Sequence, residues 1–142
     1  MTCIERIARL FPLLMNRLGR LRVLVHEGHD LTHNQYKTLL TIADAGRCSL
    51  GDLARELGVA MSSASQMVDR LVGQGLVQRT QVVDNRRQVE IRLTDTGAAL
   101  LSELQEGIVA GYGRLLMRLP EAEQEELVQS FETIARILGK LT

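Results

Sequence analysis

The sequence predicts a mainly helical fold that carries one small β-hairpin, and two observations support this prediction. Most apolar residues recur at steps of three and four, which is the spacing of one face of an α-helix. Only between residues 76 and 93 does the spacing drop to two, which is the period of a strand. With 142 residues, 45% of them hydrophobic and 24% charged, the chain is expected to form one ordinary globular domain over residues 1–142.

The first two helices are predicted from amphipathic spacing and a capping pattern. A long apolar stripe over about residues 3–27 is wider than packing against one small domain requires, so we expect this helix to have two partners. Thr32 and Gln35 have the form of a capping box that opens a second helix. Ala45-Gly46 is expected to end that helix.

Residues 49–73 are expected to form two shorter helices joined by a tight turn. Ser49 is an N-cap candidate for the first, and Gly58-Val59 ends it. In the second, apolar residues such as Ala64 and Val68 share one face. The polar residues left to face outward are Ser62, Ser63, Ser65, Gln66, Asp69 and Arg70. Two helices joined in this way form a helix-turn-helix.

A hairpin and two further helices complete the prediction. Strands are expected over Leu76–Val82 and from Val89 to Leu93, with a polar tip at Asp84–Arg87, so the hairpin forms a wing beside the helix-turn-helix. Thr94 is expected to cap a long helix over about residues 95–118. Its glycines at 107, 111 and 113 each weaken a helix by about 1 kcal/mol relative to Ala, so we expect a close contact or a bend there. Pro120 fits the first position of the last helix, residues 120–141.

Charge and motifs narrow the function classes. The net charge is zero, which does not itself indicate a nucleic-acid partner, but the acidic residues concentrate in the last third, around Glu121–Glu126. No run approaches 18 apolar residues and the first residues lack the order of a signal peptide, so we expect a cytoplasmic protein without a membrane partner. The sequence holds no phosphate loop, G-x-S-x-G or H-E-x-x-H motif, so we expect neither an enzyme nor a cofactor.

Three stretches carry a resemblance to a known family: Leu57-Gly58-Val59 through Leu76-Val77-Gln78-Arg79, the tip Asn85-Arg86-Arg87, and Leu93-Thr94-Asp95-Thr96-Gly97. They resemble the MarR (multiple antibiotic resistance) family of winged-helix transcription regulators. The resemblance implies a winged helix-turn-helix over about residues 32–97. It also implies a homodimer held by the helices at 3–27 and 120–141, and a pseudo-palindromic operator in double-stranded DNA.

The resemblance further implies a repressor that is relieved by a small lipophilic or phenolic effector. In the family, such effectors bind between the dimer helices and the DNA-binding lobe. Here Tyr36, Tyr112 and His33 are the residues expected to line that crevice. The sequence departs from the family pattern at the start of the second helix of the helix-turn-helix. Ala60 stands where a capping Ser or Thr is usual, and Met61 and Gln66 occupy positions that are often basic.

The residues expected to contact DNA divide between the helix and the wing. Ser62, Ser63, Ser65 and Gln66 suit a major groove, because hydroxyls bond phosphates or bases and Gln can pair with adenine. Guanidinium groups at the wing tip suit a narrow minor groove, and the family pattern Asp-x-Arg can be matched so that either Arg86 or Arg87 enters it. Arg70 and Arg79 are expected to contact phosphate or to form salt bridges within the protein.

Two alternatives stay open. His26, His29 and His33 are candidate metal ligands and Cys3 is a candidate sensing thiol, so a metal- or thiol-responsive regulator of the same fold is the first. A polar loop and a frayed N-terminus explain these residues without sensing, and we expect no bound metal. The second alternative is a winged helix that binds a protein partner. If affinity for duplex DNA falls steeply as the salt concentration rises, the protein contacts phosphates, which distinguishes DNA binding from this alternative.

Overall fold

The computed structural model describes residues 1–26, 32–82 and 85–142, and only the backbone of residues 85–87. Its contacts divide the chain into two compact units. Residues 26–107 form one, called here the winged unit, and residues 1–25 together with 108–142 form the other, called the helical unit. Within the described residues, no helix is both long and apolar enough to cross a membrane.

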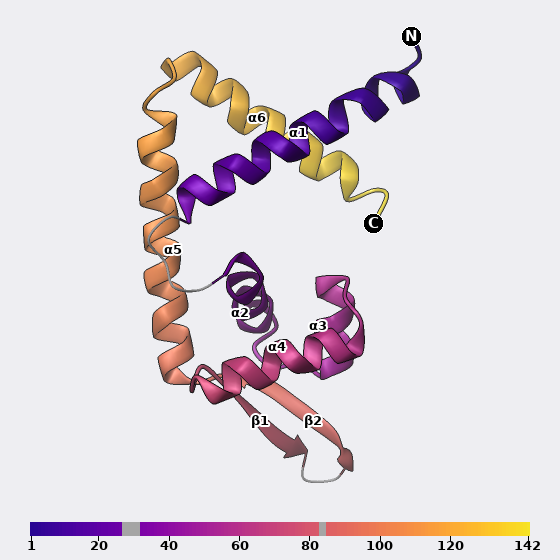
Figure 1. Cartoon of the computed structure of the whole chain (residues 1–142), viewed down its shortest axis with the longest axis vertical. Helices are drawn as coiled ribbons and strands as arrows, with labels where there is room; N and C mark the ends of the chain where they lie inside the picture. The colour runs from indigo at the N-terminus through magenta and orange to yellow at the C-terminus, as the bar shows by residue number, and fades with distance from the viewer. Residues whose placement is uncertain (27–31, 83–84) are drawn as a thin grey trace. The chain divides into compact units, whose positions relative to one another are not determined.

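The winged unit has the predicted order of a helix-turn-helix followed by a hairpin (Figure 1). Its elements are α2 (His33–Ala45), α3 (Leu50–Leu57), α4 (Met61–Gly73), β1 (Val77–Val82), β2 (Asn85–Leu93) and the first part of α5 (Asp95–Leu116). The strands are antiparallel and pair Val77 with Leu93 at the base of the hairpin. The second strand begins at Asn85, earlier than the predicted start near Val89, because Asn85 pairs with Val82 after a shift in register. Asp84, part of the predicted tip, lies outside the described residues.

The core of the winged unit draws on α2, α3, α4, the hairpin and α5. Its buried apolar residues are Leu39, Ile42, Leu53, Val68, Leu71, Leu76, Val77, Ile91 and Leu101. Thr38 is fully buried among them, and its hydroxyl donates to the Asn34 carbonyl oxygen at 2.7 Å, which satisfies the polar group. This core fixes the rotation of α4, because Val68 and Leu71 must face inward.

The predicted helix ends of the winged unit are confirmed. The Thr32 side chain accepts from the Gln35 amide at 3.2 Å, and the Gln35 side chain accepts from the Thr32 amide at 3.0 Å, which completes the capping box. Gly46 is the C-cap of α2. Gly58 ends α3 in the left-handed conformation at φ 66°, which glycine adopts at little cost. At the entry to α5, the Thr94 hydroxyl accepts from the Gly97 amide at 3.0 Å.

The helical unit contains α1 (Cys3–Val25), the last part of α5 and α6 (Glu121–Leu138). Two predicted boundaries were wrong at the junction of the last helices. The long helix ends at Leu116, and Pro120 is the N-cap of α6 because its ψ of 150° is extended and not helical. The close contact predicted for the glycines occurs at Gly111, where an added Cβ would lie 3.1 Å from the Val25 carbonyl oxygen.

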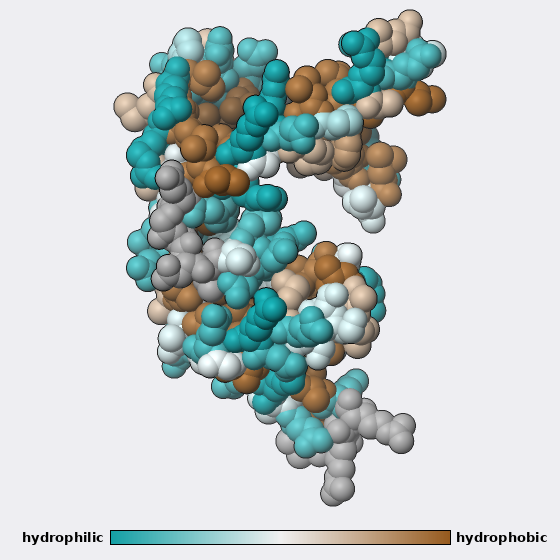
Figure 2. Space-filling view, viewed as in Figure 1, coloured by the Kyte–Doolittle hydropathy of each residue, from teal (hydrophilic) through white to brown (hydrophobic). Residues whose placement is uncertain are grey.

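The helical unit exposes most of its apolar surface. Val25 is buried, but no residue of α6 is. The exposed large apolar residues of α1 and α6 are Ile4, Ile7, Leu10, Phe11, Leu13, Leu14, Met15, Val23, Leu24, Val128, Phe131, Ile134, Ile137 and Leu138. Figure 2 shows hydrophobic side chains reaching the surface over these helices. Exposed apolar residues that recur along two helices of one unit are typical of an interaction site in a folded protein.

Candidate nucleic-acid interface

The outer face of α4 presents the polar residues that were expected to read DNA. Ser62, Ser63 and Gln66 are exposed and Ser65 is half-buried. On the opposite face Ala64, Val68 and Leu71 are fully buried. Hydroxyl and amide groups therefore stand on the solvent side of a helix whose rotation is fixed by the core, as a helix that enters a major groove requires.

The backbone N–H groups in the first turn of α4 donate no hydrogen bond to a capping side chain, because the N-cap residue has no acceptor to offer. Ala60 is the N-cap and makes no side-chain hydrogen bond, and the first turn holds no acidic residue. Backbone N–H groups at a helix N-terminus carry partial positive charge and suit contact with a phosphate. The departure from the family pattern at Ala60 is therefore compatible with a DNA-facing helix end, although it gives up the stability of a capped one.

Arg79 forms the salt bridge that was one of two alternatives for it. From β1, its Nη2 lies 2.6 Å from Oδ1 of Asp69 on α4, and it also donates to the Ser65 carbonyl oxygen at 3.4 Å. The wing and the recognition helix are thus tied together by one guanidinium group. The sequence did not reveal Asp69 as the partner, because nothing in the spacing shows that β1 returns alongside α4. Arg70 is exposed late on α4 and has no salt bridge among the described residues, so its contact with phosphate stays a prediction.

The wing tip carries the remaining predicted DNA contacts. The backbone of Arg86 and Arg87 belongs to β2, close to the turn of the hairpin. Their side chains lie outside the described part of the chain. Which arginine enters a minor groove therefore stays a prediction.

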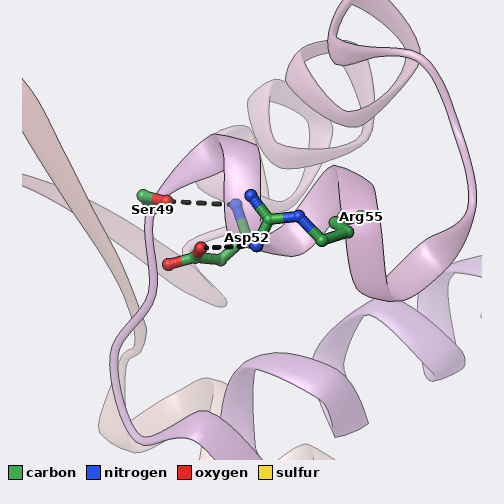
Figure 3. Close-up of polar contacts among 3 residues, drawn as sticks. All are labelled: Ser49, Asp52 and Arg55. Atoms are coloured by element: carbon green, nitrogen blue, oxygen red, sulfur yellow. Dashed lines mark hydrogen bonds and ion pairs between the residues drawn. The ribbon is translucent and has the colours of Figure 1, made fainter.

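A small polar network begins α3, the helix that packs beside α4 (Figure 3). The Ser49 hydroxyl accepts from the Asp52 amide at 3.0 Å, which confirms Ser49 as N-cap. The Arg55 guanidinium donates to the Asp52 carboxylate at 3.2 Å. Hydrogen bonds from Ser49, and then the bond and charge of Arg55, hold the pKa of Asp52 below its ordinary value. The negative charge suits the first turn of a helix.

The residues proposed to line an effector crevice belong to different units. In the winged unit the His26 ring lies 5.5 Å from that of His33 and 5.3 Å from that of Tyr36, both in edge-on arrangement. In the helical unit Tyr112 lines an apolar hollow of about 380 Å³ together with Leu21 and Phe131. The predicted crevice stays a prediction.

The metal and thiol candidates gain little from the structure. His29 lies outside the described residues, and among those that are described no three His, Cys, Asp or Glu residues gather as metal ligands. Cys3 is exposed, but the predicted frayed end was wrong. A capping box between Thr2 and Glu5 starts α1, with the Thr2 amide donating to Glu5 Oε2 at 2.7 Å. Cys48 pairs through its backbone with Ile91, and burial raises the pKa of its thiol, which disfavours the reactive thiolate.

A helix-turn-helix with a polar outer face, followed by a wing that is tied to its second helix, defines a winged-helix DNA-binding protein. Residues 31–89 match the model of the MarR family. This segment contains α2, α3, α4, β1 and part of β2. The chain belongs to the MarR family of transcription regulators.

Known proteins agree with this assignment. The HTH-type transcriptional regulator YfiV of Bacillus subtilis is 26% identical over 109 residues, which are 77% of this chain and 68% of YfiV. The homoprotocatechuate degradative operon repressor of Escherichia coli is 25% identical over 73% of this chain and 70% of its own length. A crystal structure of a mutant MarR from E. coli complexed with operator DNA superimposes with a TM-score of 0.71 at 26% identity, covering 92% of this chain and 94% of that one. These relatives are transcription regulators.

Proposed function

We propose that this protein is a homodimeric repressor that binds a pseudo-palindromic operator and releases it when a small lipophilic or phenolic effector binds. The observation that carries the proposal is the exposed polar face of α4, which lies over a closed core and is tied to the wing by Arg79. A solved relative holds operator DNA and another is a repressor of a degradative operon, and both support the same function here.

The dimer is proposed from the surface of the helical unit. Phe131, 43% exposed on α6, and Phe11, 59% exposed on α1, belong to apolar faces that a second copy would cover. The charges also complement one another. The charged residues of α1 are Arg6, Arg9, Arg17, Arg20, Arg22 and Glu5, while those of α6 are Glu121, Glu123, Glu125, Glu126, Glu132 and Arg136. Basic α1 of one copy would thus meet acidic α6 of the other, in a twofold, self-complementary interface.

The effector is proposed from the aromatic groups beside α2. The imidazoles of His26 and His33 beside Tyr36 are the groups proposed to bind the hydroxyl or carboxylate of a phenolic acid. With 3% aromatic residues in the chain, a small one-ring effector fits better than a large stacked one.

Selection of bound sequences from a random pool of duplex DNA, by the full-length protein, tests the proposal. We expect a pseudo-palindrome with half-sites about 10 bp apart, because two recognition helices related by a twofold axis read successive major grooves. Adding phenolic acids to the recovered complex should release DNA in the presence of at least one of them. A pool that shows no enrichment, or enrichment of an asymmetric single site, would contradict the dimeric repressor.

A further inference from the structure

The start of α4 presents an apolar group on a face that is otherwise polar. Met61, the first residue of the helix, is 53% exposed, and Val59 and Ala60 before it are exposed as well. The next two residues, Ser62 and Ser63, are hydroxyl-bearing and exposed. Exposing the apolar side chain of a methionine to water is unfavourable in free energy. At interfaces methionine packs well, because its long unbranched side chain adapts to the surface that it contacts.

The position of Met61 places its side chain at the leading end of the helix. Side chains in a helix lean toward the N-terminus, so that of Met61 extends beyond the first turn. In helix-turn-helix proteins the N-terminal residues of the recognition helix are the ones that reach base edges. The C5-methyl group of thymine is the apolar group that projects from a base edge into the major groove and that apolar side chains contact.

We propose that Met61 reads a thymine methyl group in each operator half-site and is a specificity-determining residue of this protein. The inference rests on the proposed docking of α4 in the major groove. It adds an apolar contact to the polar readout by Ser62, Ser63 and Gln66, which donate and accept hydrogen bonds but gain nothing from a methyl group. A lysine or arginine at this position would instead contact phosphate or guanine.

Replacing thymine by deoxyuridine, one position at a time in the selected operator, removes the methyl group and leaves base pairing unchanged. We expect wild type to lose about fourfold in affinity at one position of each half-site, the loss that corresponds to one buried methylene-sized group. Met61→Ala should bind thymine and uracil operators equally at that position. Met61→Leu should keep the discrimination, and Met61→Gln, of similar length but polar, should lose it.

Val72→Ala is the matched control, because Val72 is an exposed apolar residue near the other end of the same helix. It should discriminate as wild type does. Circular dichroism and urea unfolding of each variant verify that the overall fold and its stability are kept. If uracil costs the same affinity in wild type and Met61→Ala, or costs nothing at any position in wild type, Met61 does not read a methyl group. Absence of any DNA binding by wild type would instead refute the proposed function.

Discussion

Two glycines of α5 should respond to alanine in opposite directions. A Cβ at Gly97 would lie 2.0 Å from the Leu76 carbonyl oxygen and 2.9 Å from its carbon, which are backbone atoms. At Gly113 nothing lies within 4 Å of the added atom. Helix propensity alone favours alanine by about 1 kcal/mol at both sites. At Gly97 the clash should outweigh this gain.

The cost at Gly97 can be worked from its neighbours. Relief of the clash requires the exit of the hairpin to shift, and overpacking of this kind costs about 1–3 kcal/mol. The shift also strains the bond from the Thr94 amide to the Leu76 carbonyl, at 3.1 Å, and a buried bond of this type contributes about 1 kcal/mol. After the gain in propensity, we expect Gly97→Ala to lose about 1–3 kcal/mol of unfolding free energy.

Urea unfolding followed by circular dichroism measures both variants, at one protein concentration because a dimer makes stability concentration-dependent. Gly113→Ala should unfold at a higher urea concentration than wild type, because only the gain in helix propensity acts there. A Gly97→Ala variant as stable as wild type, with an unchanged urea dependence, would show that α5 does not approach Leu76 as closely as described.

Three further predictions test the wing, the dimer and the start of α3. Asp69→Asn and Arg79→Ala should each weaken operator binding while changing stability by no more than about 1 kcal/mol, because the pair is partly exposed. The double variant Asp69→Arg with Arg79→Asp, which exchanges the two charges, should regain part of the operator affinity. If the dependence of log affinity on log salt concentration falls by about one unit in Arg79→Ala, Arg79 contacts a phosphate instead. Phe131→Ala and Leu138→Ala should each cost the dimer a few kcal/mol if the partner buries them, measured by sedimentation, and a monomeric wild type would end the dimer proposal. The folded state lowers the pKa of Asp52, so the stability that its carboxylate contributes is present above the unfolded pKa of about 4 and is lost as pH falls through the folded pKa. Asp52→Asn should remove this loss of stability at acid pH, measured by urea unfolding over a pH series. If the pH dependence of the unfolding free energy is the same in Asp52→Asn and wild type, the network at Ser49 is not the source of that loss.

Local signals made most of the winged unit predictable. The capping box at Thr32, the N-cap at Ser49 and the glycine at 58 each depend on residues within a few positions of one another. The polar residues on the outer face of α4 were equally predictable, because the buried residues Ala64, Val68 and Leu71 follow helical spacing. Periodicity encodes such features directly.

Long-range geometry was not predictable in the same way. The ion pair of Arg79 with Asp69 joins two elements across a turn, and the contact of Gly111 with Val25 joins α5 to α1. Neither has a signature in spacing. The capping box at Thr2 was missed although its signal, a Thr followed three residues later by Glu, was present in the sequence. The exposure of Met61 could not be predicted because an apolar residue at a helix start is often a packing contact.

Titration of the operator across a salt series, with wild type and an Arg86→Ala/Arg87→Ala double variant, tests most directly whether the wing and α4 bind DNA together. Arg114→Ala with Arg118→Ala, which changes exposed arginines of the helical unit, is the control and should bind as wild type does. The wing variant should bind every sequence more weakly, with a salt slope smaller by about one or two units per wing, and should lose selectivity mainly at A·T-rich flanks. A wing variant that binds as tightly and as steeply as wild type would contradict the account.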